Sequence, residues 1–188
     1  MNIGIFITHL NKGECEFSGN NEINSVRFDS TIEQIIGKNG LFKSCRGLTQ
    51  VTIPSSVKLI GNSSFDECLS IKHIIIPLSV KSINECAFKC CKSLETIDIP
   101  PSVIDIGEGC FAYCTKLTKI SILYSIKVIR HSTFYACASL KQVDLTKSLI
   151  KIDDYAFDNC NALENVTIPK GISMGKNVFP KKNQYNNF

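Results

Sequence analysis

The sequence predicts a solenoid of stacked coils that carries a parallel β-sheet. Two observations lead to this prediction: a set of apolar residues recurs every 23 residues, and each recurrence contains a short stretch in which apolar and polar residues alternate. One such unit has too few apolar residues to form a core alone, but stacked units bury theirs against one another.

Phenylalanine and cysteine mark the repeat. Each repeated Phe is followed three residues later by a Cys, and a Leu or Ile follows three residues after that. We expect these residues to point inward and to form a structural ladder, because the same positions meet when the units stack. The ladder pairs are Phe42 and Cys45, Phe65 and Cys68, Phe88 and Cys91, Phe111 and Cys114, Phe134 and Cys137, and Phe157 and Cys160.

The alternating stretch predicts a β-strand in each unit. In residues 48–53, Leu-Thr-Gln-Val-Thr-Ile, the apolar side chains recur with the period of two that a strand with one buried face requires. Stacked units place these strands side by side, about 4.8 Å apart. The segment from Phe to Cys, for example residues 64–68, suits a short turn of helix or 3₁₀ helix on the opposite side.

The repeat also predicts the organisation of the chain. Residues 17–179 form about seven units, of which the outer ones are irregular: Asn20 takes the place of the Cys in the first unit, and residues 37–40 hold two extra residues. We expect residues 1–16 to be an N-terminal cap or lead-in and residues 180–188 to be a polar tail.

The motif resembles a known family. Leu-x-x-Val-x-Ile-Pro-x-Ser-Val-x-x-Ile-x-x-x-Ala-Phe-x-x-Cys, seen best in residues 71–91 and 94–114, is similar to the BspA-like class of leucine-rich repeats. The resemblance covers residues 17–179, although Leu123 and Thr146 replace the Pro. It implies a leucine-rich repeat solenoid, a right-handed arc with a parallel concave β-sheet and no catalytic residues. Family members are typically surface or secreted proteins of adhesion and recognition.

The outward strand positions are the candidate binding residues. Rigid strands present them on the face that we expect to be concave, where solenoids commonly bind partners. They are mostly polar, with almost no net charge, and Ile75 is the one apolar side chain, so we expect it to contribute most to binding a protein. The candidates are Gln50, Thr52, His73, Ile75, Thr96, Asp98, Lys119, Ser121, Gln142 and Asp144.

Composition argues against several other classes of protein. The 21 Lys and Arg against 17 Asp and Glu give a net charge of +4, which is too weak and too scattered to indicate nucleic-acid binding. The longest apolar runs are far shorter than the roughly 20 residues of a membrane helix. No nucleophile elbow, phosphate loop or zinc-protease helix occurs, and His9, His73 and His131 are widely separated. We therefore expect no enzyme, no cofactor and no small-molecule substrate.

The ten cysteines leave alternatives open. The six ladder thiols are best interpreted as buried and reduced, each a weak donor that can reach a turn carbonyl; disulfides between successive coils are the alternative. Cys15, Cys86, Cys90 and Cys110 lie outside the ladder. The spacing of Cys86, Cys90 and Cys91 is typical of metal ligands, but stacked coils do not aim these side chains at one point, so we expect no metal.

Three functional hypotheses remain. The first is a recognition or adhesion module; the others are a passive structural or assembly unit and a cysteine-based metal or redox protein. The N-terminus lacks the pattern of a signal peptide, and no lipid-anchor motif is present. These absences favour a cytoplasmic protein, whereas the family resemblance points to the cell surface.

Overall fold

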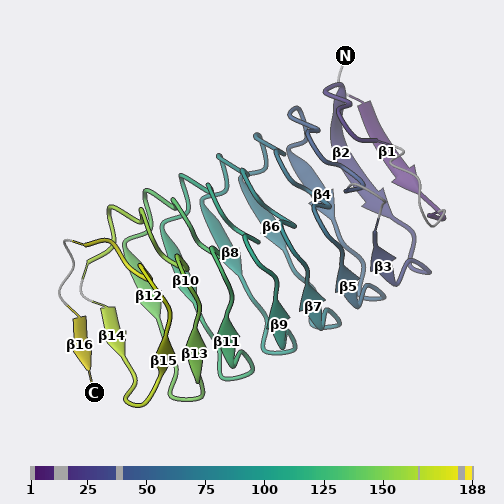
Figure 1. Cartoon of the computed structure of the whole chain (residues 1–188). Helices are drawn as coiled ribbons and strands as arrows, with labels where there is room; N and C mark the ends of the chain where they lie inside the picture. Colours follow the sequence, from purple (N-terminus) through teal and green to yellow (C-terminus); the bar gives the residue numbers. More distant parts are fainter. Residues whose placement is uncertain (1–2, 11–16, 37–39, 165, 182–184, 188) are drawn as a thin grey trace.

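The chain folds as a solenoid of about seven coils stacked along one axis (Figure 1). The computed structural model describes residues 3–10, 17–36, 40–164, 166–181 and 185–187. Each coil contributes one longer strand and one strand of two residues, which form two rows of parallel strands. The 23-residue repeat of the sequence is therefore one coil of the structure.

The longer strands form the first row. They are β1 (Ile3–Ile7), β2 (Ile23–Phe28), β4 (Gln50–Thr52), β6 (His73–Ile75), β8 (Thr96–Asp98), β10 (Lys119–Ser121), β12 (Gln142–Asp144), β14 (Val166–Ile168) and β16 (Tyr185–Asn187). Their pairings are parallel, as the stacked repeat predicts, and the register is one repeat, so that His73 lies beside Thr96 and Lys119 beside Gln142. Strand β1 pairs with β2 at one end and β16 pairs with β14 at the other.

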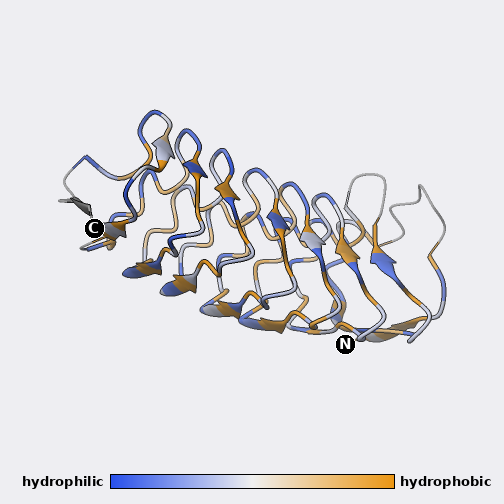
Figure 2. Ribbon diagram, turned by 90° about the horizontal axis from the view of Figure 1, so that it is seen from below, coloured by the Kyte–Doolittle hydropathy of each residue, from blue (hydrophilic) through white to orange (hydrophobic). Residues whose placement is uncertain are grey.

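The two-residue strands form the second row. They are β3 (Gln34–Ile35), β5 (Leu59–Ile60), β7 (Ser82–Ile83), β9 (Asp105–Ile106), β11 (Val128–Ile129), β13 (Lys151–Ile152) and β15 (Ser173–Met174). They pair in the same one-repeat register. Figure 2 shows the coils side by side, with hydrophobic segments recurring from one coil to the next.

The phenylalanine ladder fills the core. The six ladder Phe side chains have no exposed surface, and neighbouring rings lie nearly parallel with centroids 5.2–5.6 Å apart. Phe17 and Phe179 continue this stack at its two ends. Because each ring stacks on the rings of the adjacent coils, the core is continuous along the axis.

The helical turns expected in the segment from Phe to Cys of each unit, on the third side of the coil beside the two rows of strands, are not confirmed. In the described residues this side consists of turns, in which Ser44, Glu67 and Cys90 have φ values of 59°, 58° and 57°. A left-handed residue ends any run of right-handed helix. The turns have local bonds between residues three apart, and they also bond between coils: the N–H of Phe65 donates to the carbonyl of Ala87 at 2.8 Å, and that of Glu67 donates to Lys89 at 2.8 Å.

Candidate binding face

The predicted binding residues all lie on one surface, which we call the strand face: the outward side of β4, β6, β8, β10 and β12. Nine of the ten side chains are exposed and Ser121 is half-buried. They stand outward because the apolar residue between them in each strand turns inward; Ile74, Ile97 and Ile120 are at most 5% exposed. The alternation in the sequence therefore placed these side chains correctly.

A closed polar network occupies the strand face over β10 and β12. Asp144 accepts hydrogen bonds from Gln142 Nε2 at 2.8 Å and Ser121 Oγ at 3.1 Å, and it lies 3.3 Å from Lys119 Nζ. Partial burial raises the pKa of the Asp144 carboxyl, but these three donors outweigh it, so that the pKa is lowered overall. The charges of this region already neutralise one another, and a partner would have to break these contacts to use them.

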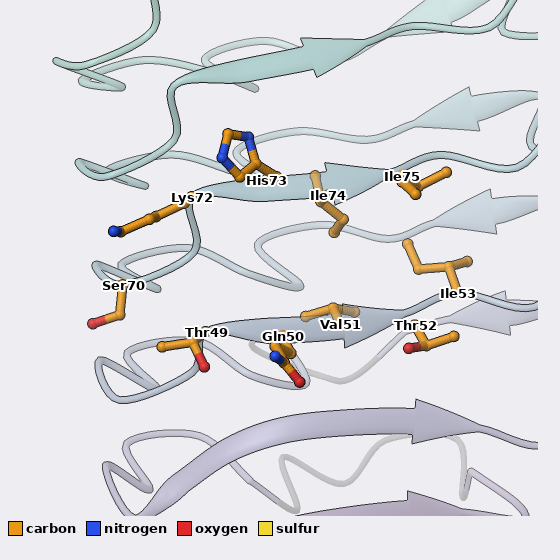
Figure 3. A pocket seen from close by; sticks show the side chains of 10 residues that line it. All are labelled: Thr49, Gln50, Val51, Thr52, Ile53, Ser70, Lys72, His73, Ile74 and Ile75. Atoms are coloured by element: carbon orange, nitrogen blue, oxygen red, sulfur yellow. The ribbon is translucent and has the colours of Figure 1, made fainter.

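The strand face is different over β4 and β6. Strand β4 pairs with β2, and β6 pairs with β8, but among the described strands no backbone pairing joins β4 to β6. A hollow of 730 Å³ lies over this junction (Figure 3). Its lining residues are Thr49, Gln50, Val51, Thr52, Ile53, Ser70, Lys72, His73, Ile74 and Ile75.

Apolar surface is accessible in this hollow. Val51 is half-buried, whereas the equivalent Ile74 and Ile97 of the next coils are only 5% exposed. Ile75 is 83% exposed, the largest exposed fraction among the large hydrophobic side chains of the described residues. The ring of His73 is held by a 3.1 Å contact between its Nδ1 and the hydroxyl of Thr96. The hollow thus combines an apolar floor with an exposed Ile.

Sequence reasoning found only part of this hollow. It identified Gln50, Thr52, His73 and Ile75, but it missed Thr49, Ser70 and Lys72, which lie just before strands β4 and β6. No pattern in the sequence shows that the pairing between β4 and β6 is open. The position immediately before each strand could have been included on the ground that it borders the same face.

The ladder cysteines form a column of hydrogen bonds. Each thiol donates to the carbonyl of the ladder Phe in the preceding coil: Cys68 to Phe42 at 3.1 Å and Cys91 to Phe65 at 3.2 Å. The remaining four follow the same pattern at 2.9–3.2 Å. Burial raises the pKa of the Cys91 and Cys114 thiols well above the ordinary value, which keeps them protonated and able to donate.

The other described cysteines do not converge on a metal. Cys110 is fully buried, while Cys86 and Cys90 are half-buried, and burial raises the pKa of both half-buried thiols. In the described part of the chain no group of three or more His, Cys, Asp and Glu side chains is arranged to hold a metal ion. The nine cysteines that the structure describes are free thiols; Cys15 lies outside the described residues.

The repeat found in the sequence matches a known family of repeat proteins. A family described as the BspA type leucine-rich repeat region, in six copies, matches residues 10–131 and 105–188. The chain belongs to the BspA-type leucine-rich repeat family. Among curated proteins none matches its sequence.

Several solved structures share the fold of this BspA-type chain. A leucine-rich repeat protein of T. pallidum is 23% identical with a TM-score of 0.76, and the match covers 86% of this chain and 78% of that protein. One from Bacteroides ovatus is 25% identical with a TM-score of 0.69, covering 97% and 60%. A leucine-rich cell surface protein of Faecalibacterium prausnitzii is 22% identical with a TM-score of 0.55, covering 87% and 64%.

The BspA-type chain spans only part of the length of each of these proteins. It spans 78% of the T. pallidum protein but only 60% and 64% of the other two. Pneumococcal vaccine antigen PcpA is a further structural neighbour, 18% identical with a TM-score of 0.56, and 59% of it is covered. In the described residues no helix is long and apolar enough to cross a membrane.

Proposed function

We propose that this chain is a non-catalytic recognition module that binds a protein partner through the strand face, with the hollow between β4 and β6 as the anchoring point. The single observation that carries the proposal is the 730 Å³ hollow with Ile75 exposed at 83%. An exposed apolar side chain on rigid strands costs little conformational entropy when it becomes buried against a partner.

The contrast along the strand face supports this choice of anchor. Over β10 and β12, Asp144 is engaged by three neighbouring side chains. Over β4 and β6, apolar surface is open and backbone pairing is absent. Binding energy comes mainly from desolvated apolar contacts, while exposed polar groups mostly contribute specificity. We therefore expect the centre of the interface to lie on β4 and β6. The partner would also contact the outward polar side chains of β8, β10 and β12.

The neighbours bear on where such a module would act. One of them is described as a cell surface protein and another as a vaccine antigen. These descriptions favour display at a surface for this chain as well.

The test compares two matched substitutions in one coil. Ile75→Arg places a charge in the hollow. Leu78→Arg is the control: it introduces the same charge outside the hollow, at a side chain that is 72% exposed and follows the strand. The wild type and both variants are immobilised, and proteins captured from an extract of cell-surface proteins are identified by mass spectrometry. Proteins held by the wild type and Leu78→Arg but lost with Ile75→Arg support the proposal; equal recovery with all three contradicts it.

A further inference from the structure

A second surface departs from the repeat on the turn side of the coils, away from the strand face. Three of the five tyrosines of the chain, Tyr113, Tyr135 and Tyr155, lie here with His131. Tyr113 and Tyr135 are in edge-to-face contact with centroids 5.4 Å apart, and His131 and Tyr155 are at 5.7 Å. We call these four residues the tyrosine patch.

The tyrosine patch borders a hollow of 320 Å³. Gly109 and Ala112 are small residues in its lining, and Tyr113, Tyr135 and His131 contribute rings. The other lining residues are Glu85, Cys86, Lys89, Glu108 and Ser132. A space of this size accepts one long side chain or a small organic molecule.

The backbone does not require a glycine at position 109, in the lining of this hollow. Gly109 has a φ of 57°, but the equivalent positions of other coils hold Ser63, Cys86 and Ser132 at 51–53° and Tyr155 at 59°. A side chain is therefore tolerated at this repeat position, and a Cβ on Gly109 would meet Cys86 Sγ at 3.4 Å, an ordinary contact. What the glycine provides is the empty space between the neighbouring coils.

The rings are held in place and remain accessible. Asn159 Nδ2 donates a hydrogen bond of 3.0 Å to the hydroxyl of Tyr135. Tyr113 is 41% exposed, and His131 is exposed as well. Tyrosines at fixed positions supply large contact areas at small entropic cost, and they are enriched among the residues that dominate binding.

The charges around the hollow are mainly negative. Glu85 and Glu108 are exposed at its margin, against the single ammonium of Lys89. The positive charge of Lys89 also acts on another carboxylate: burial raises the pKa of Asp66, and the charges of Lys43 and Lys89 oppose that rise. Two free carboxylates beside aromatic rings form an environment that favours an organic cation.

We propose that this hollow binds an arginine side chain of a protein partner. A guanidinium group stacks on aromatic rings and also bonds carboxylates through a planar fork of N–H donors, so it matches both features of the site. A lysine ammonium is also attracted by the rings, but it has neither a planar face to stack on them nor a fork of N–H donors for a carboxylate. The site is independent of the strand face and could engage a different segment of the same partner or a different protein.

The test uses N-acetyl-arginine N-methylamide and its citrulline counterpart, which has a similar shape without the charge. The probes are titrated into the full chain with isotopically labelled tyrosine, and NMR follows the ring signals. We expect the arginine probe to shift Tyr113 and Tyr135 but not Tyr124, which is 66% exposed elsewhere, and the citrulline probe to bind about fivefold more weakly.

Variants link this binding to the hollow. Gly109→Ser introduces the residue that Ser63 and Ser132 already place in the same conformation, so it should fold, and it should weaken the arginine probe about fivefold or more by filling the space. Tyr113→Leu and Glu108→Gln should each weaken it by a factor of about three to five. The exposed Glu164→Gln is the charge control and should leave the affinity unchanged.

The possible outcomes separate the two proposals. Equal binding of the two probes, equal shifts at Tyr124, or full affinity in Gly109→Ser would overturn the arginine site. Ile75→Arg should leave probe binding unaltered, since it lies on the strand face, so failure of the strand-face proposal does not affect this measurement. Thermal unfolding of each variant confirms that a loss of binding is not a loss of fold.

Discussion

At the scale of single residues, each ladder thiol adds a second hydrogen bond to a backbone carbonyl that already accepts one. The carbonyl of Phe65 accepts the N–H of Cys68 at 3.2 Å, and the thiol of Cys91 donates to the same oxygen at 3.2 Å without bringing a strongly polar group into the core. Asn20, at the same repeat position, acts differently: its Oδ1 accepts from the N–H of Glu22 at 3.0 Å. The predicted role of the thiol as a donor is confirmed.

Among the described residues, Asp66 is the one Asp, Glu, Lys or Arg side chain that is buried. It is 6% exposed, one carboxylate oxygen lies 3.2 Å from Lys43 Nζ, and the other has no hydrogen-bond partner. Burial raises the pKa of Asp66, against the opposing charge of Lys43. The folded state therefore binds the proton more tightly than the unfolded chain, and this contribution to stability is lost as the pH rises through the raised pKa.

This sign gives a prediction for Asp66→Asn, which keeps the shape of the side chain and cannot ionise. The stability of the wild type relative to this variant should fall as the pH rises from about 4, the ordinary pKa of Asp, toward neutrality. Urea unfolding of both proteins between these pH values measures the difference. A wild type that gains stability relative to Asp66→Asn over the same interval would show that the ion pair with Lys43 outweighs burial.

At the scale of structural elements, the sequence predicted the strands well and the turns poorly. Strands β6 and β8 fall on the alternating stretches because a period of two leaves one arrangement with an apolar interior. The turns between Phe and Cys are short and apolar in part, so a helical turn and a turn with a left-handed residue look alike in sequence. What separates them is the hydrogen bonding to the next coil, as between Phe65 and Ala87, which local sequence does not encode.

The candidate site was predictable to the same extent. Alternation identified the outward residues of the strand face, including Ile75. The missing backbone pairing between β4 and β6 was not predictable, because these two stretches alternate in the same way as stretches that do pair. The tyrosine patch was also missed, since its residues occupy repeat positions that vary freely and only stacking brings Tyr113 against Tyr135.

The phenylalanine ladder is the element on which the stability of the stack depends. Phe88 is fully buried between Phe65 and Phe111, with ring centroids 5.4 and 5.6 Å away. We expect Phe88→Ala to lower the free energy of unfolding by about 3–5 kcal/mol, because it removes the ring and leaves a cavity between two coils. Denaturant unfolding measures this change. Tyr124→Ala, at an exposed ring, should change stability by less than about 0.5 kcal/mol, and equal effects of the two substitutions would contradict the ladder.

At the scale of the whole molecule, the solenoid is modular because each coil contacts only its neighbours. Residues 78–100 are one repeat, and their removal joins Pro77 to Pro101 in the same local sequence, Ile-Pro-Pro-Ser-Val, that surrounds Pro100 in the wild type. We expect this deletion to fold, with β6 pairing to β10 in the register that β6 and β8 have now. The slope of its free energy of unfolding against denaturant concentration should be lower by about one seventh, because this slope is proportional to the surface buried on folding and one of about seven coils is gone.

A deletion of residues 89–100 is the matched control, since it removes half a coil and leaves Phe88 without the thiol and strand that follow it. We expect it to lose cooperative unfolding and the far-ultraviolet signal of the sheet. If both deletions fold equally well, the 23-residue coil is not the unit of the structure.

The longer deletion also separates the two surfaces. It retains all ten residues that line the hollow between β4 and β6, and it removes Glu85, Cys86 and Lys89 from the hollow beside the tyrosine patch. Partner capture through the strand face should therefore survive in a chain that has lost one wall of the arginine site.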